Sequence, residues 1–585
     1  MLNEWIVTLY NREDLDDFYE DMQTPGGNLY IPDRAVDVAK QRPISRNTHY
    51  MLTDEEAMLV KSDERVWDVS LAELVRNSFQ PLGYKIDEGI FSKNYLSSGP
   101  TLAETDINWA FLRQTRNAQI PEWGFNNQEF DPTNDLAKSE INANANNVII
   151  TASGRNVDVV IVDTHFPHDH PEFAVNPDGT GGSRVVSYNW LQNDIGFGTG
   201  TYDYTLSDQD NHGGHVAGTV AGNTQGWARD ANIYHMSPFP NTPNFGVAGY
   251  SGDTLWDFVR AWHNSKPINP VTGRKNPTIS NHSYTSLTDA GQYGYSPIKA
   301  VTYRGTRYAP GRDLTVSELQ ARGYAATSQT FKFLAYYTSL HADIQDAIDD
   351  GIIIVAAAGN ESWKIVGPTD QDYDNTYETI YLPTSQPQVG YVHRGSGLQS
   401  GQSYAPVIVV GAVDTVIDEY KATFSNCGNL VDVYAVGMGV QSSVYLTTYY
   451  AMMFDPRNSQ FYFGKTQGTS MASPQVCGML ACLAESWPNM NQAQAHQWIV
   501  DFANNDQLSD TGTDDASDFR SLQGAPNKFA KWTNQRPIRG GVFPQRKFRP
   551  RTIDGDPTPL VSRGGGAPTR IGRRVYPRPR IRRRG

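Results

Sequence analysis

The chain has 585 residues, of which 39% are hydrophobic and 19% charged, so it is long and apolar enough for a large folded core and is not a disordered chain. The three cysteines, Cys427, Cys477 and Cys482, are too few and too irregularly spaced for a disulfide framework or a cysteine zinc site, and we expect them to pack as small hydrophobic groups. No run approaches the roughly 18 uncharged apolar residues of a membrane span, and the first residues lack the pattern of a secretory signal. We therefore expect a protein made in the cytoplasm that does not contact a membrane.

Charge is distributed unevenly along the chain. Residues 536–585 carry fourteen arginines and one lysine against two aspartates, a net charge of +13, so in a chain of net charge −14 the remaining residues sum to −27. Because this end is also rich in Pro and Gly, residues 531–585 are predicted to be a disordered basic tail on an acidic body. Binding of a polyanion such as nucleic acid through 536–585 is one interpretation, and a merely solvated end is the other.

Residues 1–70 are predicted to form a small α+β module. Its strand–helix–strand–helix–strand pattern places these elements at 4–10, 14–22, 49–52, 53–60 and 65–69. Thr53 and Glu56 form a capping box at the start of the second helix. The pattern is compatible with a ferredoxin-like fold. Residues 71–105 have no strong period and are expected to be a linker.

The segment 106–530 is predicted to be an α/β domain built on a parallel sheet. Apolar runs typical of buried strands lie at 156–163, 232–236, 278–283, 352–360, 407–413 and 430–436. Helical patterns, such as the one at 253–262, separate these runs. In sheets of this kind, ligand-binding and catalytic groups gather at the carboxyl ends of the strands.

Four polar residues lie at the ends of predicted elements. Asp163 and Asn360 end apolar strands, while His212 and Ser470 begin helices that are rich in small residues. A serine at a helix N-terminus lies beside backbone N–H groups that can hold an oxyanion. Pro474 is expected in the first turn of its helix, where its missing N–H costs nothing.

These four side chains supply each part of an acyl-transfer site. His212 can remove the proton of Ser470, Asp163 can fix the tautomer of His212, and the amide of Asn360 can stabilise a tetrahedral oxyanion. The alternative is structural: a capped core helix at Ser470 and a strand-end carboxylate at Asp163.

Each of the four residues lies in a short motif: VIVDT at 160–164 with HPEF at 170–173, HGGHVAGT at 212–219, AAAGNE at 356–361 and GTSMASP at 468–474. These motifs, and the order Asp, His, Ser along the chain, resemble the subtilisin family of serine peptidases. The resemblance covers roughly residues 106–530 and implies a three-layer α/β fold with serine endopeptidase activity on polypeptides. It implies Asp163, His212 and Ser470 as the catalytic triad and Asn360 as the oxyanion donor, with no cofactor required for catalysis.

The resemblance also implies further sites and a partner. The substrate-binding residues would be Ser283, Tyr284, Thr285, Ala358 and Gly359. The 1–70 module resembles the inhibitor propeptides of the family, which implies that it is a partner of the peptidase domain and that the chain is processed within 71–105.

Several features depart from the family pattern. His165 stands where the family has Gly, and the cleft sequence Ser-Leu-Gly-Gly is replaced by 283–286, SYTS, so the P1 preference cannot be transferred. The loop 223–230 is shorter than in calcium-binding subtilisins, so structural calcium remains possible but no metal site is assigned. Segments that look like insertions lie at 287–338, 362–404 and 445–466.

Two further interpretations remain. His165, His168, Asp169 and His170 are expected to form a polar loop, with a metal cluster as the alternative. The alternative to an active enzyme is a non-catalytic interaction or virion-associated protein on a subtilisin-like fold, tethered by its basic tail. The large insertions and the tail also resemble subtilases encoded by large bacteriophages.

Overall fold

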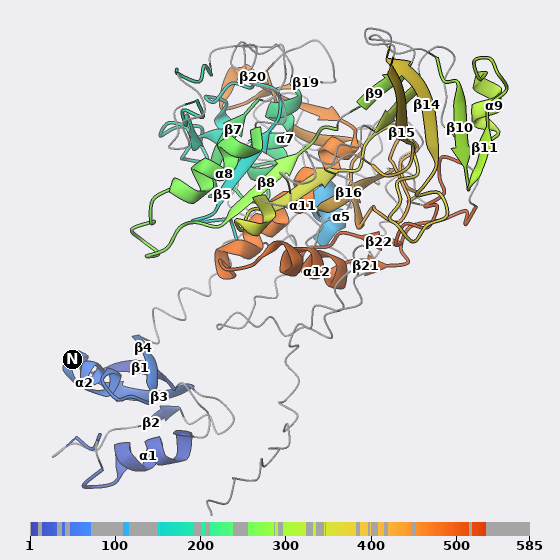
Figure 1. The fold of residues 1–585 in the computed structure, drawn as a ribbon. Helices are drawn as coiled ribbons and strands as arrows, with labels where there is room; N and C mark the ends of the chain where they lie inside the picture. Colours follow the sequence, from blue (N-terminus) through green and yellow to red (C-terminus); the bar gives the residue numbers. More distant parts are fainter. Residues whose placement is uncertain are drawn as a thin grey trace, which may run out of the picture. The chain divides into compact units, whose positions relative to one another are not determined.

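The computed structural model describes residues 2–71, 109–115 and 150–533 with internal gaps (Figure 1). The gaps are 10–13, 28, 32–37, 41–46, 151, 192–199, 205–210, 238–254, 286, 291–296, 323, 325–330, 335–343, 345–346, 382–385, 396–397, 399–406, 415–418, 446–451 and 514–517. Almost all of the predicted linker 71–105 and basic tail 531–585 lie outside the described residues. The chain divides into two compact units, Met1–Gly83 and Tyr84–Gly585.

The first unit is the predicted α+β module. Its elements are β1 Asn3–Leu9, α1 Leu15–Gln23, β2 Val38–Lys40, β3 Asn47–Leu52, α2 Asp54–Lys61 and β4 Val66–Leu71. They form an antiparallel sheet in the order β2-β3-β1-β4, which is the ferredoxin-like arrangement. Strand β2 was not predicted. The capping box is confirmed, because Thr53 N donates to Glu56 Oε2 at 2.8 Å and Glu56 N donates to Thr53 Oγ1 at 3.3 Å.

The second unit is organised around a nine-stranded sheet. Its order is β21-β22-β17-β16-β13-β8-β5-β7-β6. The strands are β5 Asp158–Val162, β6 Val185–Val186, β7 Asn232–Met236, β8 Thr278–His282, β13 Ile353–Ala357, β16 Ile408–Val413, β17 Val433–Val436, β21 Asn504–Asn505 and β22 Lys528–Phe529. All neighbours are parallel except β21 and β22. The predicted parallel sheet is confirmed.

Helices cover both faces of this sheet. They are α5 Trp109–Thr115, the 3₁₀ helix η2 Pro171–Phe173, α7 His212–Ala221, α8 Leu255–Ser265, α11 Thr469–Ser486 and α12 Gln492–Phe502. Side chains of β5 alternate between two hydrophobic clusters: Val159 and Ile161 pack with α7 and α11, whereas Val160 and Val162 pack with α8. This alternation gives the expected three-layer architecture.

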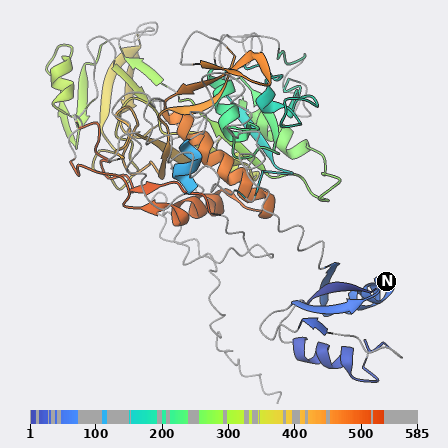
Figure 2. The same cartoon turned by 180° about the vertical axis from the view of Figure 1, so that it is seen from behind.

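The second unit contains two smaller sheets, which are named here for use below. The accessory sheet consists of β18 Val440–Val444, β19 Met452–Asp455 and β20 Asn458–Thr466. The outer sheet consists of β10 Ala300–Tyr303, β11 Thr306–Tyr308, β14 Thr376–Tyr381 and β15 Gln386–Tyr391, and α9 Val316–Gln320 lies in the same segment. The same unit contains a two-stranded pair, β9 Leu287–Ala290 and β12 Phe331–Leu334. Viewed from behind, the yellow-green strands of the outer sheet stand apart from the teal helix α7 and the orange helix α11 (Figure 2).

Two expectations from composition can be compared with this fold. Cys427, Cys477 and Cys482 are all buried, which agrees with the expectation that they pack as small hydrophobic groups. Within the described ranges, no helix is both long and apolar enough to cross a membrane.

Candidate active site

Asp163 and His212 form a close pair at the carboxyl end of β5. Asp163 follows the last residue of the strand and is 1% exposed, and His212 is the first residue of α7. The His212 Nδ1 and Asp163 Oδ1 atoms lie 2.6 Å apart. A carboxylate at this position requires the proton on Nδ1, which leaves Nε2 as the basic atom of the neutral ring.

Thr164 fixes the geometry of this pair from the next position in the chain. Its backbone N donates to Asp163 Oδ1 at 2.8 Å, and its hydroxyl accepts from Gly213 N at 2.8 Å. A side chain on Gly213 would lie 2.1 Å from the carbonyl oxygen of Thr164, so only glycine permits this approach. The turn after β5 and the start of α7 are thereby joined directly.

Ser470 is the second residue of α11 and is buried beside β8. Its Oγ donates to Ser283 O at 3.2 Å, and Ser283 Oγ donates to Ser470 O at 3.0 Å. Pro474 is the sixth helical residue, so the expectation that it lies in the first turn is wrong. Because Pro474 has no N–H for the carbonyl of Ser470, that carbonyl accepts its hydrogen bond from Ser283 instead.

Asn360 lies in an exposed turn after β13 and is tied to the start of α11. Its Oδ1 accepts from Thr469 N at 2.9 Å and from Thr469 Oγ1 at 2.8 Å, so Nδ2 is the remaining donor of the amide. A Cβ built on Gly468 would lie 3.6 Å from both Asn360 Nδ2 and Ser470 N. Gly468 has φ 148°, a conformation that favours glycine. The amide donor and the N–H of Ser470 therefore border the same space.

The turn that presents Asn360 is held by Asn426, which the sequence analysis missed. Asn426 Nδ2 donates to Ala358 O at 2.8 Å, and its Oδ1 accepts from the backbone N of Glu361 and Trp363. A side chain on Gly359, at φ +104°, would lie 2.2 Å from Asn426 Nδ2. Residues 423–426 resemble a late strand of the subtilisin family, but this pattern does not show the role of Asn426, because its partners lie about 65 residues earlier.

Strand order explains how the predicted residues meet. Strands β5, β8 and β13 are parallel neighbours, so Asp163, Ser283 and Asn360 follow the same edge of the sheet. Ser470 joins this edge through Ser283, and His212 joins it through Asp163.

The predicted substrate-binding residues follow β8 and β13. Ser283 is buried against Ser470, and Ala358 and Gly359 are also buried. Tyr284 and Thr285 are half-buried. The Tyr284 hydroxyl lies 3.0 Å from His282 Nδ1, and burial together with the negative charge of Asp163 raises the pKa of this phenol.

The histidines after Asp163 form packed and hydrogen-bonded contacts. His168 Nε2 lies 3.0 Å from His235 Nδ1, and His235 Nε2 donates to Thr164 O at 3.1 Å. His170 Nε2 donates to Tyr462 O at 3.1 Å. His165 packs against the ring of His235 without adopting a positive φ. Within the described residues, no group of three or more His, Cys, Asp or Glu is placed to hold a metal ion. The contacts of these histidines are the ones that the polar-loop interpretation requires, and that interpretation stays a prediction.

Comparison with known protein families gives a match over most of the second unit. A model of the Subtilase family, peptidase S8, matches residues 154–522, which is more than half of the chain. The chain belongs to the subtilase family. Its members are serine endopeptidases, so the protein is a subtilisin-like serine endopeptidase whose substrates are polypeptides.

Individual relatives are distant. Subtilisin DY from Bacillus licheniformis is 25% identical over 355 residues, which is 60% of this subtilase and 85% of the relative. Subtilisin amylosacchariticus from Bacillus subtilis subsp. amylosacchariticus is 25% identical over 342 residues, 58% of this chain and 59% of that protein. The crystal structure of a cold adapted subtilisin-like serine proteinase matches at 18% identity and a TM-score of 0.39, covering 73% of this chain and 98% of its own.

Proposed function

We propose that this subtilase hydrolyses peptide bonds through an acyl-enzyme on Ser470. The observation that carries the proposal is the 2.6 Å contact between His212 Nδ1 and the buried Asp163, which leaves Nε2 to act as the base. In the free enzyme Ser470 Oγ donates to Ser283 O, so its hydroxyl turns toward His212 when substrate binds. Asp163 then stabilises the imidazolium that forms.

The proposed oxyanion site consists of Asn360 Nδ2 and the N–H of Ser470. Both donors border the position of Gly468. The N–H of Ser470 is available because N–H groups in the first turn of a helix have no intrahelical acceptor. These donors would bind the carbonyl oxygen of the scissile peptide bond once that oxygen carries negative charge in the tetrahedral intermediate. Such binding lowers the barrier of the chemical step and leaves the affinity for the ground-state substrate unchanged.

Ser470→Ala tests the proposal. The substitution removes one hydroxyl from a buried site, so the domain should stay folded while kcat falls by about six orders of magnitude. Thr469→Ser at the neighbouring position is the matched control and should retain activity, since it keeps the hydroxyl that bonds Asn360. If the Ser470→Ala enzyme, freed of contaminating protease, turns over peptide at the wild-type rate, Ser470 is not the nucleophile and the proposal fails. Absence of peptide hydrolysis by the wild-type protein would instead favour the non-catalytic interaction protein.

We further propose that the βαββαβ module acts as a propeptide that the enzyme removes itself. The support is its ferredoxin-like sheet, which is followed by a segment that the sequence predicts to be a linker. Intact-mass analysis should show wild type cleaved within about residues 71–105 and the Ser470→Ala protein at full length. Equal masses would identify the module as a permanent domain.

The basic end, residues 536–585, is proposed to bind a polyanion independently of catalysis. Its charge of +13 against −27 for the rest supports this, and its few aromatic residues argue against sequence preference. The affinity for duplex DNA should fall by about 0.9 log unit per log unit of salt for each phosphate contacted. Truncation after Gln535 should abolish DNA binding and leave peptidase activity intact. Equal DNA affinity of both proteins would refute the nucleic-acid interpretation.

A further inference from the structure

The accessory sheet is bound to the start of α7, the helix whose first residue is His212. The backbone N of Tyr445, just after β18, donates to Asn211 Oδ1 at 2.9 Å. Ser443 Oγ donates to Gly214 O at 2.8 Å. The residues before and after His212 are therefore both held by this one sheet.

The middle of α7 is equally close to β18. His215 Nε2 donates to Val440 O at 2.8 Å, so this ring carries its proton on Nε2, and burial lowers the pKa of His215 to about 3. A Cβ on Gly218 would lie 2.3 Å from the hydroxyls of Ser442 and Ser443. The small residues of α7 thus allow a strand of the accessory sheet to contact the helix along its length.

The turn after α7 is held by Glu172, which follows β5 in the chain. Its carboxylate accepts from Thr224 N at 3.0 Å, Gln225 N at 2.9 Å and Thr224 Oγ1 at 2.7 Å. The side chain of Glu172 is 0% exposed. A carboxylate with no access to water needs a cation as well as hydrogen-bond donors.

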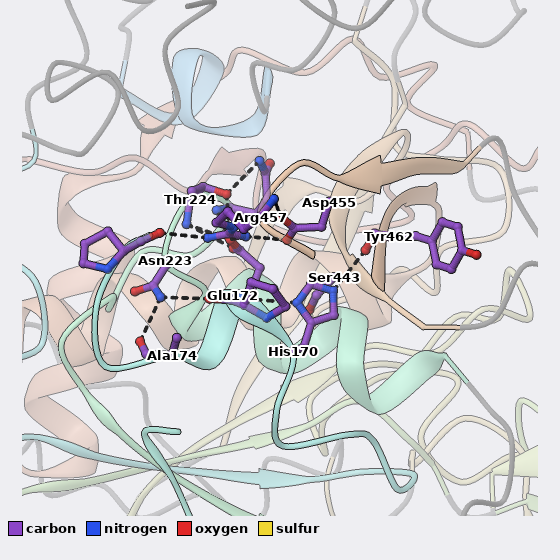
Figure 3. A network of polar contacts seen from close by, with 12 residues as sticks. His170, Glu172, Ala174, Asn223, Thr224, Ser443, Asp455, Arg457 and Tyr462 are labelled. Atoms are coloured by element: carbon purple, nitrogen blue, oxygen red, sulfur yellow. Dashed lines mark hydrogen bonds and ion pairs between the residues drawn. The ribbon is translucent and has the colours of Figure 1, made fainter. Parts of the chain in front are cut away.

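Arg457 supplies that cation from the turn between β19 and β20. Its Nη2 lies 2.5 Å from Glu172 Oε1 and 2.6 Å from Asp455 Oδ2, and its Nε donates to Asp455 Oδ1 at 2.8 Å. Figure 3 shows the Arg457 side chain lying between Glu172 and Asp455. Burial would raise the pKa of Glu172, but the guanidinium and the donors at Thr224 and Gln225 outweigh it and lower that pKa.

His170 adds a second link between the same two segments. Its Nε2 donates to Tyr462 O in β20, and its Nδ1 accepts from Glu172 N at 3.1 Å (Figure 3). The segment that follows the catalytic aspartate and the helix that follows the catalytic histidine are therefore fastened to one body, the accessory sheet.

We propose that the accessory sheet positions His212 against Asp163. The ion pairs of Arg457 with Glu172 and Asp455 hold the accessory sheet in place. Arg457 is then a positioning residue for the proposed triad, on which this inference rests. Without its guanidinium, Glu172 and Asp455 would face each other as uncompensated buried charges, and the sheet would move away from α7. A shift of His212 by a fraction of an ångström weakens proton transfer far more than it weakens peptide binding.

The test compares two buried arginines that each pair with a glutamate. Arg457→Met removes the ion pairs with Glu172 and Asp455. Arg113→Met removes the ion pair with Glu419, which links α5 to residue 419 and contacts none of the proposed catalytic residues. Kinetics are measured per active site, by titration with a fluorophosphonate, at a temperature where both variants are folded. We expect Arg457→Met to lower kcat by about 10²-fold with KM unchanged, and Arg113→Met to leave both unchanged.

Two readouts separate positioning from general destabilisation. In Arg457→Met the acid limb of the kcat/KM profile should move to lower pH, because a weaker contact with Asp163 stabilises the imidazolium less. Arg457→Lys keeps the positive charge but not the planar guanidinium that bonds both carboxylates, so it should recover part of the kcat that Arg457→Met loses. A wild-type kcat and pH profile in Arg457→Met would overturn the proposal.

Two milder serine substitutions test the proposal if Arg457→Met does not fold. Ser443→Ala removes the bond to Gly214 O, whereas Ser442 lies beside it with a hydroxyl that makes no hydrogen bond within the described residues. Ser443→Ala should lower kcat about fivefold and Ser442→Ala should not. Equal kcat in the two variants overturns the proposal. Undiminished turnover in Ser470→Ala would instead refute the proposed function itself.

Discussion

The accessory and outer sheets belong to the same unit as the α/β core, yet they pack against different hydrophobic clusters. The accessory sheet has its arginine buried, with Arg457 1% exposed between Glu172 and Asp455, and its Val440 belongs to the main hydrophobic core. The outer sheet pairs Arg307 with Glu378 at the surface, with side chains 56% and 31% exposed. It packs on a hydrophobic cluster of its own, which includes Val301, Leu319 and Tyr377.

This difference shows how a small sheet can constrain the elements around the proposed site. A sheet that packs on a hydrophobic core of its own can vary with less effect on the rest of the fold. A sheet that lacks one must bury its polar groups against the parent fold, and those groups then constrain the elements they contact. In this subtilase the constrained element is α7, which carries His212.

The largest expected effect lies at the start of α7. His212→Ala should lower kcat by about six orders of magnitude, nearly as much as Ser470→Ala, because the triad acts as a unit. The double variant His212→Ala/Ser470→Ala should be no slower than either single one. Additive losses in a peptide-hydrolysis assay would contradict the shared mechanism.

A smaller effect is expected on the far side of the site. Asn360→Ala should lower kcat by about 10²–10³-fold with little change in KM, the range found when one oxyanion donor is removed from a subtilisin. Asn360 contacts Thr469, not the accessory sheet, so this loss should add to that of Ser443→Ala. A change confined to KM would show that the amide binds the ground state.

Acid should destabilise the catalytic region. Burial lowers the pKa of His168 to about 4 and those of His215 and His282 to about 3. Between these values and about 6.5 the unfolded chain binds protons that the folded chain does not, so stability is full above pH 6.5 and falls as the pH decreases. Melting temperatures from pH 8 to 5 should fall less steeply for His168→Gln than for wild type. Parallel curves would exclude His168 as a source of the acid sensitivity.

The smallest effect is expected in the outer sheet. Arg307→Met removes an exposed ion pair with Glu378 and should leave both kcat and the melting temperature unchanged within error. A kcat loss comparable to that of Arg457→Met would show that the outer sheet also controls the site, and the contrast between the two sheets would disappear.

The residues of the proposed site could be predicted from the sequence because each lies in a short local motif. Asp163 and Asn360 follow parallel strands, and His212 and Ser470 lie in the first turns of helices, each within a short sequence pattern. Strand order then brings them to one edge of the sheet. The ferredoxin-like module followed equally from alternating strands and helices, although the three-residue strand β2 was too short to give a signal.

What the sequence could not predict depends on contacts between distant segments. Glu172 lies 285 residues before Arg457, and no periodicity indicates that an arginine so far along the chain pairs with a carboxylate in the segment that follows Asp163. The misplacement of Pro474 has a similar origin, because the carbonyl that it leaves without a helical donor is satisfied by Ser283, on a different strand.

The most direct test of the central claim is to find which atom reacts with a fluorophosphonate. The wild-type protein should be labelled once, on the peptide that contains Ser470, and His212→Ala should react orders of magnitude more slowly although its serine is intact. Labelling of a different serine, or labelling of Ser470 at the same rate without His212, would contradict the proposed nucleophile and base.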